Sequence, residues 1–260
     1  MTETPAAFLI PGIVNLRDAG GQASVDGRRV RTGVLFRSGQ LGRTEGDGVA
    51  HLGLSVVFDL RGVDELAAAP DLVPDDVELV HLDVLADSEE RIATHLADLI
   101  SRPDLLTEAV DSGAIDDHYR ATYRNLVLLD SARASYATLF TRLAELDRPA
   151  LFHCTAGKDR TGWAAAALLS LLGVEDRVVT EDYLRSSAPV IESFAAVFDG
   201  FAAAGGDRAA LVPLFAVTEG YLQESHDTVR EHFGSLDGWF RDGLGLSDDV
   251  ADRLRARLLV

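Results

Sequence analysis

Cysteine is nearly absent from this 260-residue sequence, which contains only Cys154. One cysteine excludes an internal disulfide, so the thiol is available for chemistry and the chain suits a reducing compartment. No apolar run approaches the roughly 18 residues that span a bilayer, and residues 1–7 lack the basic-then-apolar layout of a signal peptide. We therefore expect a cytoplasmic location and no stable membrane insertion.

Positive charge is also scarce, since 24 Lys and Arg face 42 Asp and Glu and leave a net charge of −18. This balance argues against binding to nucleic acid and against broad adhesion to anionic membranes. The histidines show no pair at a metal-binding spacing such as His-Glu-x-x-His, so we expect neither a metal nor another cofactor. A phosphorylated substrate would be attracted only where the few cations are concentrated.

One segment does concentrate them: His153–Gly162, which reads HCTAGKDRTG and separates Cys154 from Arg160 by five residues. A short apolar run of strand type precedes it. The Ala- and Leu-rich run Trp163–Leu172 follows and ends at Gly173, which is typical of a helix with a terminal glycine. The loop therefore lies at a helix N-terminus, where unpaired N–H groups and the helix dipole bind anions.

The residue types in this loop suit nucleophilic attack on a phosphoryl group. The helix dipole, Lys158 and Arg160 favour the thiolate of Cys154 over the thiol. Gly157 allows the backbone amides to turn inward, the guanidinium of Arg160 can bind two phosphate oxygens, and Thr161 can donate a hydrogen bond to the sulfur when the leaving group departs. The predicted substrate-binding set is the loop itself: His153, Thr155, Ala156, Gly157, Lys158 and Thr161.

This segment resembles the signature loop of the cysteine-dependent protein tyrosine phosphatases, and its Gly-Lys-Asp-Arg-Thr-Gly form is similar to the bacterial branch typified by mycobacterial PtpB. Further matches in the same order cover nearly the whole chain: Asn15–Asp18, Leu35–Ser38, Asp59–Arg61, Asp182–Ser186 and Gly234–Leu236. The resemblance implies hydrolysis of phosphotyrosine, often also of phosphoserine, phosphothreonine and phosphoinositides. Members of this branch can also leave the cell without a recognisable signal peptide.

Strands that alternate with helices around one strand-loop-helix site predict an α/β fold, with a central mostly parallel sheet flanked by helices. We expect strands at 34–37, 54–60 and 77–83, a helix at 131–146, and a helical C-terminal part with breaks at Pro189, Gly205, Gly234 and Gly245. The length suits a single phosphatase domain, residues 1–260.

Apolar residues at helical spacing, among them Ile92, Leu96 and Leu99, indicate an amphipathic insertion. The resemblance implies that residues of about 88–117 form a helical lid over the active site. The alternative is that these helices pack on the flank of the domain.

Three aspartates are candidates for the general acid that protonates the leaving oxygen. Asp87 is the first choice, because the resemblance places a candidate aspartate at this distance after His81. Asp83 is the second. Asp159, inside the loop, is the third, and the family pattern has a functional aspartate there too.

Several other charged residues are expected to brace the loop rather than to touch substrate. They lie at the ends of predicted strands, where ion pairs between neighbouring strands can form. His153 is expected to hydrogen-bond backbone near Cys154 and not to act as a base. The predicted bracing residues are Arg17, Asp18, Arg37, Asp59 and Arg61.

The predicted reaction is therefore metal-free hydrolysis of a phosphorylated protein through a phosphocysteine on Cys154. A phosphoinositide is the alternative substrate, because Lys158 adds a positive charge that could bind a second phosphate. Two other classes remain open: an inactive phosphate-binding adaptor, and sulfur transfer through a persulfidated cysteine.

Overall fold

A five-stranded sheet forms the centre of the computed structural model, which describes residues 12–42, 48–88 and 102–260. The strand order is β1-β2-β5-β3-β4, and only the β1–β2 pair is antiparallel. The mostly parallel sheet expected from the sequence is thus confirmed. The strands are β1 (Arg17–Asp18), β2 (Leu35–Ser38), β3 (Val56–Asp59), β4 (Glu78–His81) and β5 (Ala150–His153).

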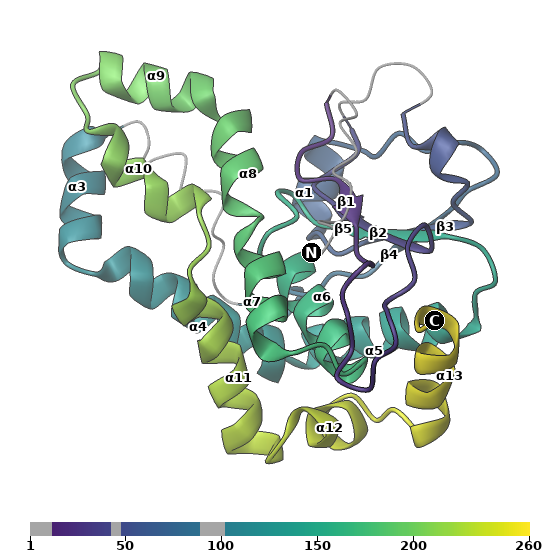
Figure 1. Cartoon of the computed structure of the whole chain (residues 1–260). Helices are drawn as coiled ribbons and strands as arrows, with labels where there is room; N and C mark the ends of the chain where they lie inside the picture. The colour runs from purple at the N-terminus through teal and green to yellow at the C-terminus, as the bar shows by residue number, and fades with distance from the viewer. Residues whose placement is uncertain (1–11, 43–47, 89–101) are drawn as a thin grey trace.

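Helices make up most of the remaining structure (Figure 1). Close pairs are α4 with α11, α5 with α13, α6 with α7, and α3 with α10. Together α3, α9 and α10 form a group that projects to the left of the sheet in Figure 1. The helices are α1 (Val63–Ala68), α3 (Pro103–Asp111), α4 (Ala114–Leu128), α5 (Asp130–Glu145), α6 (Arg160–Leu171), α7 (Asp176–Leu184), α8 (Ser187–Ser193), α9 (Ala195–Ala203), α10 (Arg208–Phe215), α11 (Glu219–Phe233), α12 (Leu236–Gly238) and α13 (Asp248–Leu258), with a short 3-10 helix η1 (Ala50–Leu52) and a short π-helix η2 (Trp239–Gly243).

The strands place successive side chains on opposite faces of the sheet. Val57 and Leu151 belong to a small hydrophobic cluster on one face, whereas Phe58 and Phe152 belong to the main core on the other. Helix α6 lies in that main core and is buried along almost its whole length. Its run of alanines allows the helix to pack closely, and this holds the N-terminus of α6 beside the end of β5.

Several local expectations are confirmed. Strands β2, β3 and β4 and helix α5 lie where the patterns predicted them, and Gly205, Gly234 and Gly245 mark helix ends. The predicted helix break at Pro189 is wrong, because Pro189 lies in the first turn of α8. The interruption lies earlier, between the end of α7 at Leu184 and the start of α8 at Ser187. Proline is tolerated in a first turn, where its missing N–H has no intrahelical acceptor.

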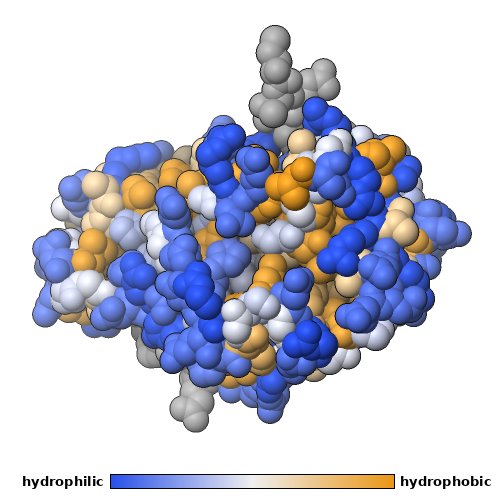
Figure 2. All heavy atoms as spheres, turned by 60° about the horizontal axis from the view of Figure 1, so that its bottom comes forward, coloured by the Kyte–Doolittle hydropathy of each residue, from blue (hydrophilic) through white to orange (hydrophobic). Residues whose placement is uncertain are grey.

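Of the apolar positions that suggested a lid, Ile92 to Ile100 lie outside the described residues, and Leu105 and Leu106 lie on α3. In the described parts of the chain, no helix is long and apolar enough to cross a membrane. The face seen in Figure 2 is mostly hydrophilic, with hydrophobic residues interspersed among charged and polar ones.

Candidate active site

The signature loop follows β5, the central strand, at the carboxyl edge of the sheet. Cys154 is the first residue after the strand, and α6 begins at Arg160. Gly157 has φ of 68°, and a Cβ there would lie 2.3 Å from the carbonyl oxygen of Ser38 and 2.7 Å from the nitrogen of Gly39. Only glycine fits both the left-handed backbone and this close approach to the end of β2.

A buried network holds the loop from behind, and we call it the rear brace: Asn15, Arg17, Arg37, Asp182 and Ser186. Asn15 Nδ2 and an Arg37 nitrogen donate to the carbonyl of Gly157 at 2.9 and 3.0 Å. Asp182 pairs with Arg37 at 2.9 Å and with Arg17 at 3.3 Å. Burial alone would raise the pKa of the Asp182 carboxyl, but the two arginines hold it below its usual range. The expectation that Arg17 and Arg37 brace the loop is thus confirmed.

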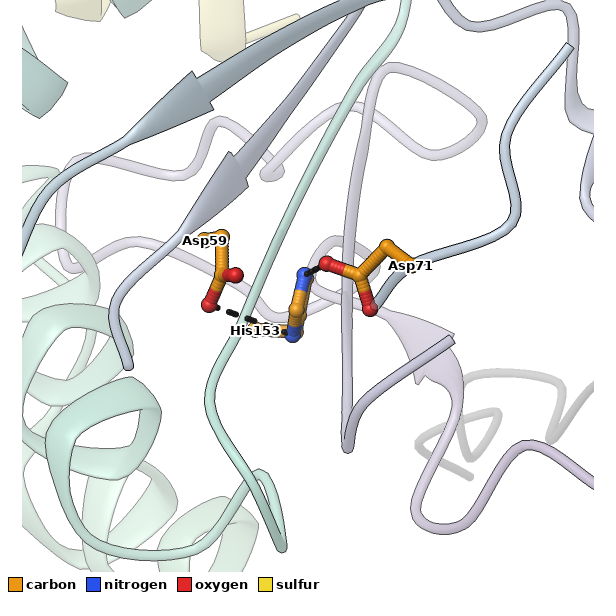
Figure 3. A group of neighbouring side chains, drawn as sticks. All are labelled: Asp59, Asp71 and His153. Carbon is orange, nitrogen blue, oxygen red and sulfur yellow. Dashed lines mark ion pairs between the residues drawn. The ribbon is translucent and has the colours of Figure 1, made fainter. Parts of the chain in front are cut away.

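A second buried cluster is formed by Asp59, Asp71 and His153, the residue that precedes Cys154 (Figure 3). His153 lies between Asp59 and Asp71, with Nε2 2.9 Å from an Asp71 oxygen and Nδ1 3.3 Å from the carbonyl of Cys154. Both carboxylates also contact one nitrogen of Arg61 at 2.8 Å. His153 is fully buried, with its ring nitrogens near the two carboxylates and the carbonyl of Cys154.

The donor atoms of Asp59, Asp71 and His153 lie within 4.8 Å of one another, a spacing that could hold a metal ion. However, the guanidinium of Arg61 already lies against both carboxylates and supplies the positive charge that they need. A cation there would be repelled by this fixed charge. The cluster therefore fits a structural ion-pair network better than a metal site.

Asp18, by contrast, accepts only the backbone N–H groups of Gly20 and Gly33 in the described contacts.

In front of the loop is a cavity of about 410 Å³ that is lined by four of the catalytic candidates: Cys154, Arg160, Asp159 and Asp83. Cys154 and the loop residues form its floor. Tyr119 on α4, Phe194 after α8 and Phe215 on α10 form an apolar wall, and Ser88 also lines it. Of the described residues of the expected lid, Ser88 lines the cavity and residues 102–117 do not, but α3 packs against α10, which does.

Arg160 is bound by a residue that the sequence analysis did not identify, Glu65 on α1. Two guanidinium nitrogens lie 2.5 and 2.8 Å from the two oxygens of Glu65. Thr155 Oγ1 also donates to Glu65, and the amide of Gly62 lies 2.9 Å away. Burial would raise the pKa of Glu65, but these donors more than offset it and lower the pKa to about 2. Two of the five N–H donors of Arg160 are engaged, and the others can serve phosphate.

Lys158 and Asp159 form the other pair that faces the cavity. Lys158 Nζ lies 3.0 Å from Asp159 Oδ1 and 2.9 Å from Oδ2, and 4.4 Å from the centre of the Tyr119 ring. Burial opposes the charge of Lys158, but Asp159 outweighs it and raises the pKa of the lysine. Tyr123 donates to Asp159 Oδ1 at 3.0 Å.

The three candidate acids occupy different places. Asp159 and Asp83 line the cavity, and Asp83 accepts the amide of Leu85 at 3.1 Å. Asp87 is exposed and accepts the hydroxyl and the amide of Ser131 at the start of α5. Desolvation would raise the pKa of Asp87, but these hydrogen bonds together outweigh it and lower the pKa. The structure therefore gives Asp87 a helix-capping contact instead of a place in the cavity.

The remaining loop groups are ready for an anion. Within the described chain, the backbone N–H groups of residues 155–159 donate to no other group. The hydroxyl of Thr161 is buried and likewise has no hydrogen-bond partner among the described residues. Unmade hydrogen bonds in a buried site are costly, so a bound phosphoryl group would satisfy several donors at once.

Sequence reasoning missed Glu65, Asp71 and Tyr123. Glu65 stands three residues after Gly62 at the start of α1, a spacing that signals a helix start but no contact with Arg160. Asp71 follows α1 in an irregular segment, and Tyr123 lies on the apolar face of α4, where a core role is the first interpretation. Their contacts with the loop depend on tertiary structure alone.

Known proteins are similar to this chain over most of its length. The profile of the tyrosine phosphatase family matches residues 8–260. Triple specificity protein phosphatase PtpB of Mycobacterium tuberculosis is 33% identical over 277 residues, which cover 96% of this chain and 98% of that protein. A tyrosine-protein phosphatase of Nostoc commune is 29% identical, covering 86% of this chain and 74% of that protein. The crystal structure of P. aeruginosa TpbA covers 94% of this chain and 99% of that one, with 16% identity and a TM-score of 0.40.

Proposed function

The chain belongs to the tyrosine phosphatase family and is a phosphatase, and from this premise we propose that it hydrolyses phosphotyrosine through a phosphocysteine on Cys154. One observation carries the proposal: the only thiol of the chain lies at the floor of a cavity, on a loop with free amides and the guanidinium of Arg160. Such a loop can stabilise the charge on phosphorus in both transition states.

The reaction has two steps. The sulfur of Cys154 attacks phosphorus while Asp159 protonates the leaving phenol oxygen. Water then attacks phosphorus, the S–P bond breaks, and Asp159 accepts a proton from that water. Asp159 is preferred because it lines the cavity from within the loop, beside Arg160, and Asp83 is the second candidate.

The apolar wall of the cavity favours a substrate with an aromatic leaving group. The rings of Tyr119, Phe194 and Phe215 line the cavity above Cys154, where they can contact the ring of a phosphotyrosine. Phosphoserine and phosphothreonine are shorter, so we propose lower activity on both. Only a free thiol is active, and we propose a reducing compartment for this chain.

The phosphoinositide alternative rested on a free positive charge at Lys158. In the structure this side chain is buried, pairs with Asp159 and lies over Tyr119. Its charge is therefore already neutralised, and a second phosphate gains less from it. We keep a phosphorylated protein as the proposed substrate.

For the lid, we propose that α8 and α10, supported by α3, cover the cavity within a single domain of residues 1–260. Val190 on α8 and Leu214 on α10 line the cavity, and α3 lies behind α10. Limited proteolysis with and without vanadate tests this idea, because a lid that closes on an anion should be cleaved more slowly when vanadate is bound.

The test of the function compares wild type with Cys154→Ser on a phosphotyrosine peptide, phosphoserine peptides and a phosphoinositide, without added metal. We expect turnover to be highest on phosphotyrosine and to fall by at least about 10⁴-fold in the variant. Residual activity of the serine variant near that of wild type would contradict the mechanism. Absence of turnover by wild type on every substrate would instead favour a phosphate-binding adaptor. Thiocyanate production from thiosulfate would favour sulfur transfer.

A further inference from the structure

Two buried tyrosines approach Asp159 from the helical side of the loop. Tyr123 on α4 is fully buried, and its hydroxyl lies 3.0 Å from Asp159 Oδ1. Tyr183 on α7 donates to the oxygen of Tyr123 at 2.5 Å. Because Tyr183 supplies the proton of that bond, the proton of Tyr123 is directed at Asp159.

The two carboxylate oxygens of Asp159 therefore have different surroundings. Oδ1 receives Tyr123 and Lys158, whereas Oδ2 contacts only Lys158 among the described residues. A carboxylic acid carries its proton on the oxygen that accepts fewer hydrogen bonds, because each donor disfavours a proton at its own acceptor. Oδ2 is thus the oxygen that can hold and release a proton.

We propose that Tyr123 is a positioning residue that fixes Asp159 Oδ1 and leaves Oδ2 to exchange the proton with substrate and water. This inference rests on the proposed function, in which Asp159 is the acid. In the first step the S–P bond forms, the P–O bond breaks, and the Oδ2 proton moves to the leaving oxygen. In the second step the water oxygen bonds to phosphorus, the S–P bond breaks, and a water proton returns to Oδ2.

Tyr123 itself keeps its proton throughout. Burial and the nearby charge of Asp159 raise its pKa well above the usual value for tyrosine. Tyr183, behind it, is also buried, and its pKa is likewise raised well above the usual value. The pair therefore acts as a neutral hydrogen-bond donor of fixed direction and not as a proton relay.

The same helix that carries Tyr183 also carries Asp182 of the rear brace. Asp182 acts through Arg37 on the carbonyl of Gly157, and Tyr183 acts through Tyr123 on Asp159. Two adjacent residues of α7 thus reach both halves of the loop. This arrangement explains how the acid keeps a fixed position relative to the anion-binding amides.

Tyr136→Phe provides a matched control. Tyr136 on α5 is a fully buried tyrosine beside the same loop, but its hydroxyl donates to the carbonyl of Arg160 at 3.1 Å and not to Asp159. Each substitution removes one buried hydroxyl next to the loop. Of the two substitutions, only Tyr123→Phe removes a hydrogen bond to the proposed acid.

The experiment measures kcat on phenyl phosphate and on p-nitrophenyl phosphate, whose leaving group is less basic and needs less protonation. We expect Tyr123→Phe to lower kcat on phenyl phosphate about tenfold more than on p-nitrophenyl phosphate, with KM changed less than about twofold. Tyr136→Phe should lower both rates by the same factor. Equal loss on both substrates in Tyr123→Phe, or selective loss in Tyr136→Phe, would overturn the proposal.

Two further variants separate the possible failures. Asp159→Asn should show the largest selective loss on phenyl phosphate, and its absence would reject both the assigned acid and the role of Tyr123. Selective loss in Asp159→Asn without selective loss in Tyr123→Phe would reject the role of Tyr123 alone. If Tyr123→Phe does not fold, Tyr183→Phe is tested in its place. A selective loss of kcat on phenyl phosphate that is smaller than the loss in Asp159→Asn supports the proposal. Equal loss of kcat on both substrates overturns it.

Discussion

The two sides of the signature loop use the same chemical pairing, arginine or lysine with a carboxylate, under opposite conditions. Behind the loop, the side chains of Arg37 and Asp182 are 1% and 5% exposed, and Arg61 pairs with two carboxylates that are fully buried. In front, Arg160 and Glu65 are 13% and 27% exposed. The rear pairs can only hold the loop, whereas the front pairs can meet a substrate.

This difference has an energetic meaning. Desolvation makes a buried charge costly unless its partner is present, so loss of one partner behind the loop should destabilise the fold. The Arg160–Glu65 pair in front is partly solvated. Loss of Glu65 should therefore lower mainly the catalytic rate, because the guanidinium of Arg160 loses its fixed orientation. The comparison therefore predicts a separation between variants that lose stability and variants that lose activity.

The largest effect is expected for Asp182→Ala, which leaves Arg17 and Arg37 buried without their carboxylate. We expect the free energy of unfolding to fall by about 3–5 kcal/mol. Urea denaturation measures this loss. Asp242→Ala is the control, because Asp242 and Arg241 form an ion pair in which both side chains are exposed to solvent. That variant should change stability by less than about 1 kcal/mol, and equal losses in both variants would remove the contrast.

Glu65→Gln should show the opposite balance. Arg160 loses its bidentate carboxylate and with it a fixed orientation, so we expect kcat/KM to fall by about 10–100-fold, mainly in kcat. Glutamine still accepts the amide of Gly62, and the helix start should survive. Steady-state kinetics and thermal denaturation together test the point, since a variant that kept full activity would show that Glu65 does not aim the guanidinium.

The depressed pKa of Glu65 gives a pH test of the same pair. Its value of about 2 lies below the ordinary 4.5, so the pair contributes stability that is fully present above about pH 4.5. This stability is lost as the pH falls towards 2, because the unfolded chain then binds a proton that the folded chain does not. Between pH 6 and pH 3 wild type should lose about 2 kcal/mol more than Glu65→Gln. Parallel losses in both proteins would show that the carboxylate is not held in this way.

The contrast between the two sides also explains what the sequence could predict. Cys154 and Arg160 lie in one short segment, and their spacing at a strand-helix junction determines the geometry locally. Glu65 lies 95 positions before Arg160 and Tyr123 lies 36 positions before Asp159, and neither pairing has a periodic or local signal. The centre of the sheet was predictable because β3 and β5 are buried, largely apolar runs of ordinary length, whereas β1 consists only of Arg17–Asp18.

The place of the acid is harder to predict from the sequence for the same reason. Position along the chain favoured Asp87, but a shift of a few residues along a loop decides whether a carboxylate faces the cavity. Asp83 and Ser88 line the cavity, and Asp87 between them bonds Ser131 instead. Tertiary contacts with α5, not spacing, determine which of the aspartates is available.

The smallest effects are expected at these two aspartates. Asp87→Asn weakens a capping contact on α5, so we expect a loss of stability of about 1 kcal/mol and a change in kcat/KM below about twofold.

Asp83→Asn leaves a side chain of the same shape in the cavity and should lower kcat/KM by less than about tenfold, equally for basic and less basic leaving groups. The measurement compares phenyl phosphate with p-nitrophenyl phosphate for both variants. If Asp83→Asn instead reproduces the selective loss expected of Asp159→Asn, the acid lies on the wall of the cavity and not in the loop. The front of the loop would then supply only the nucleophile and the anion-binding groups, and the Lys158–Asp159 pair would belong with the structural pairs behind it.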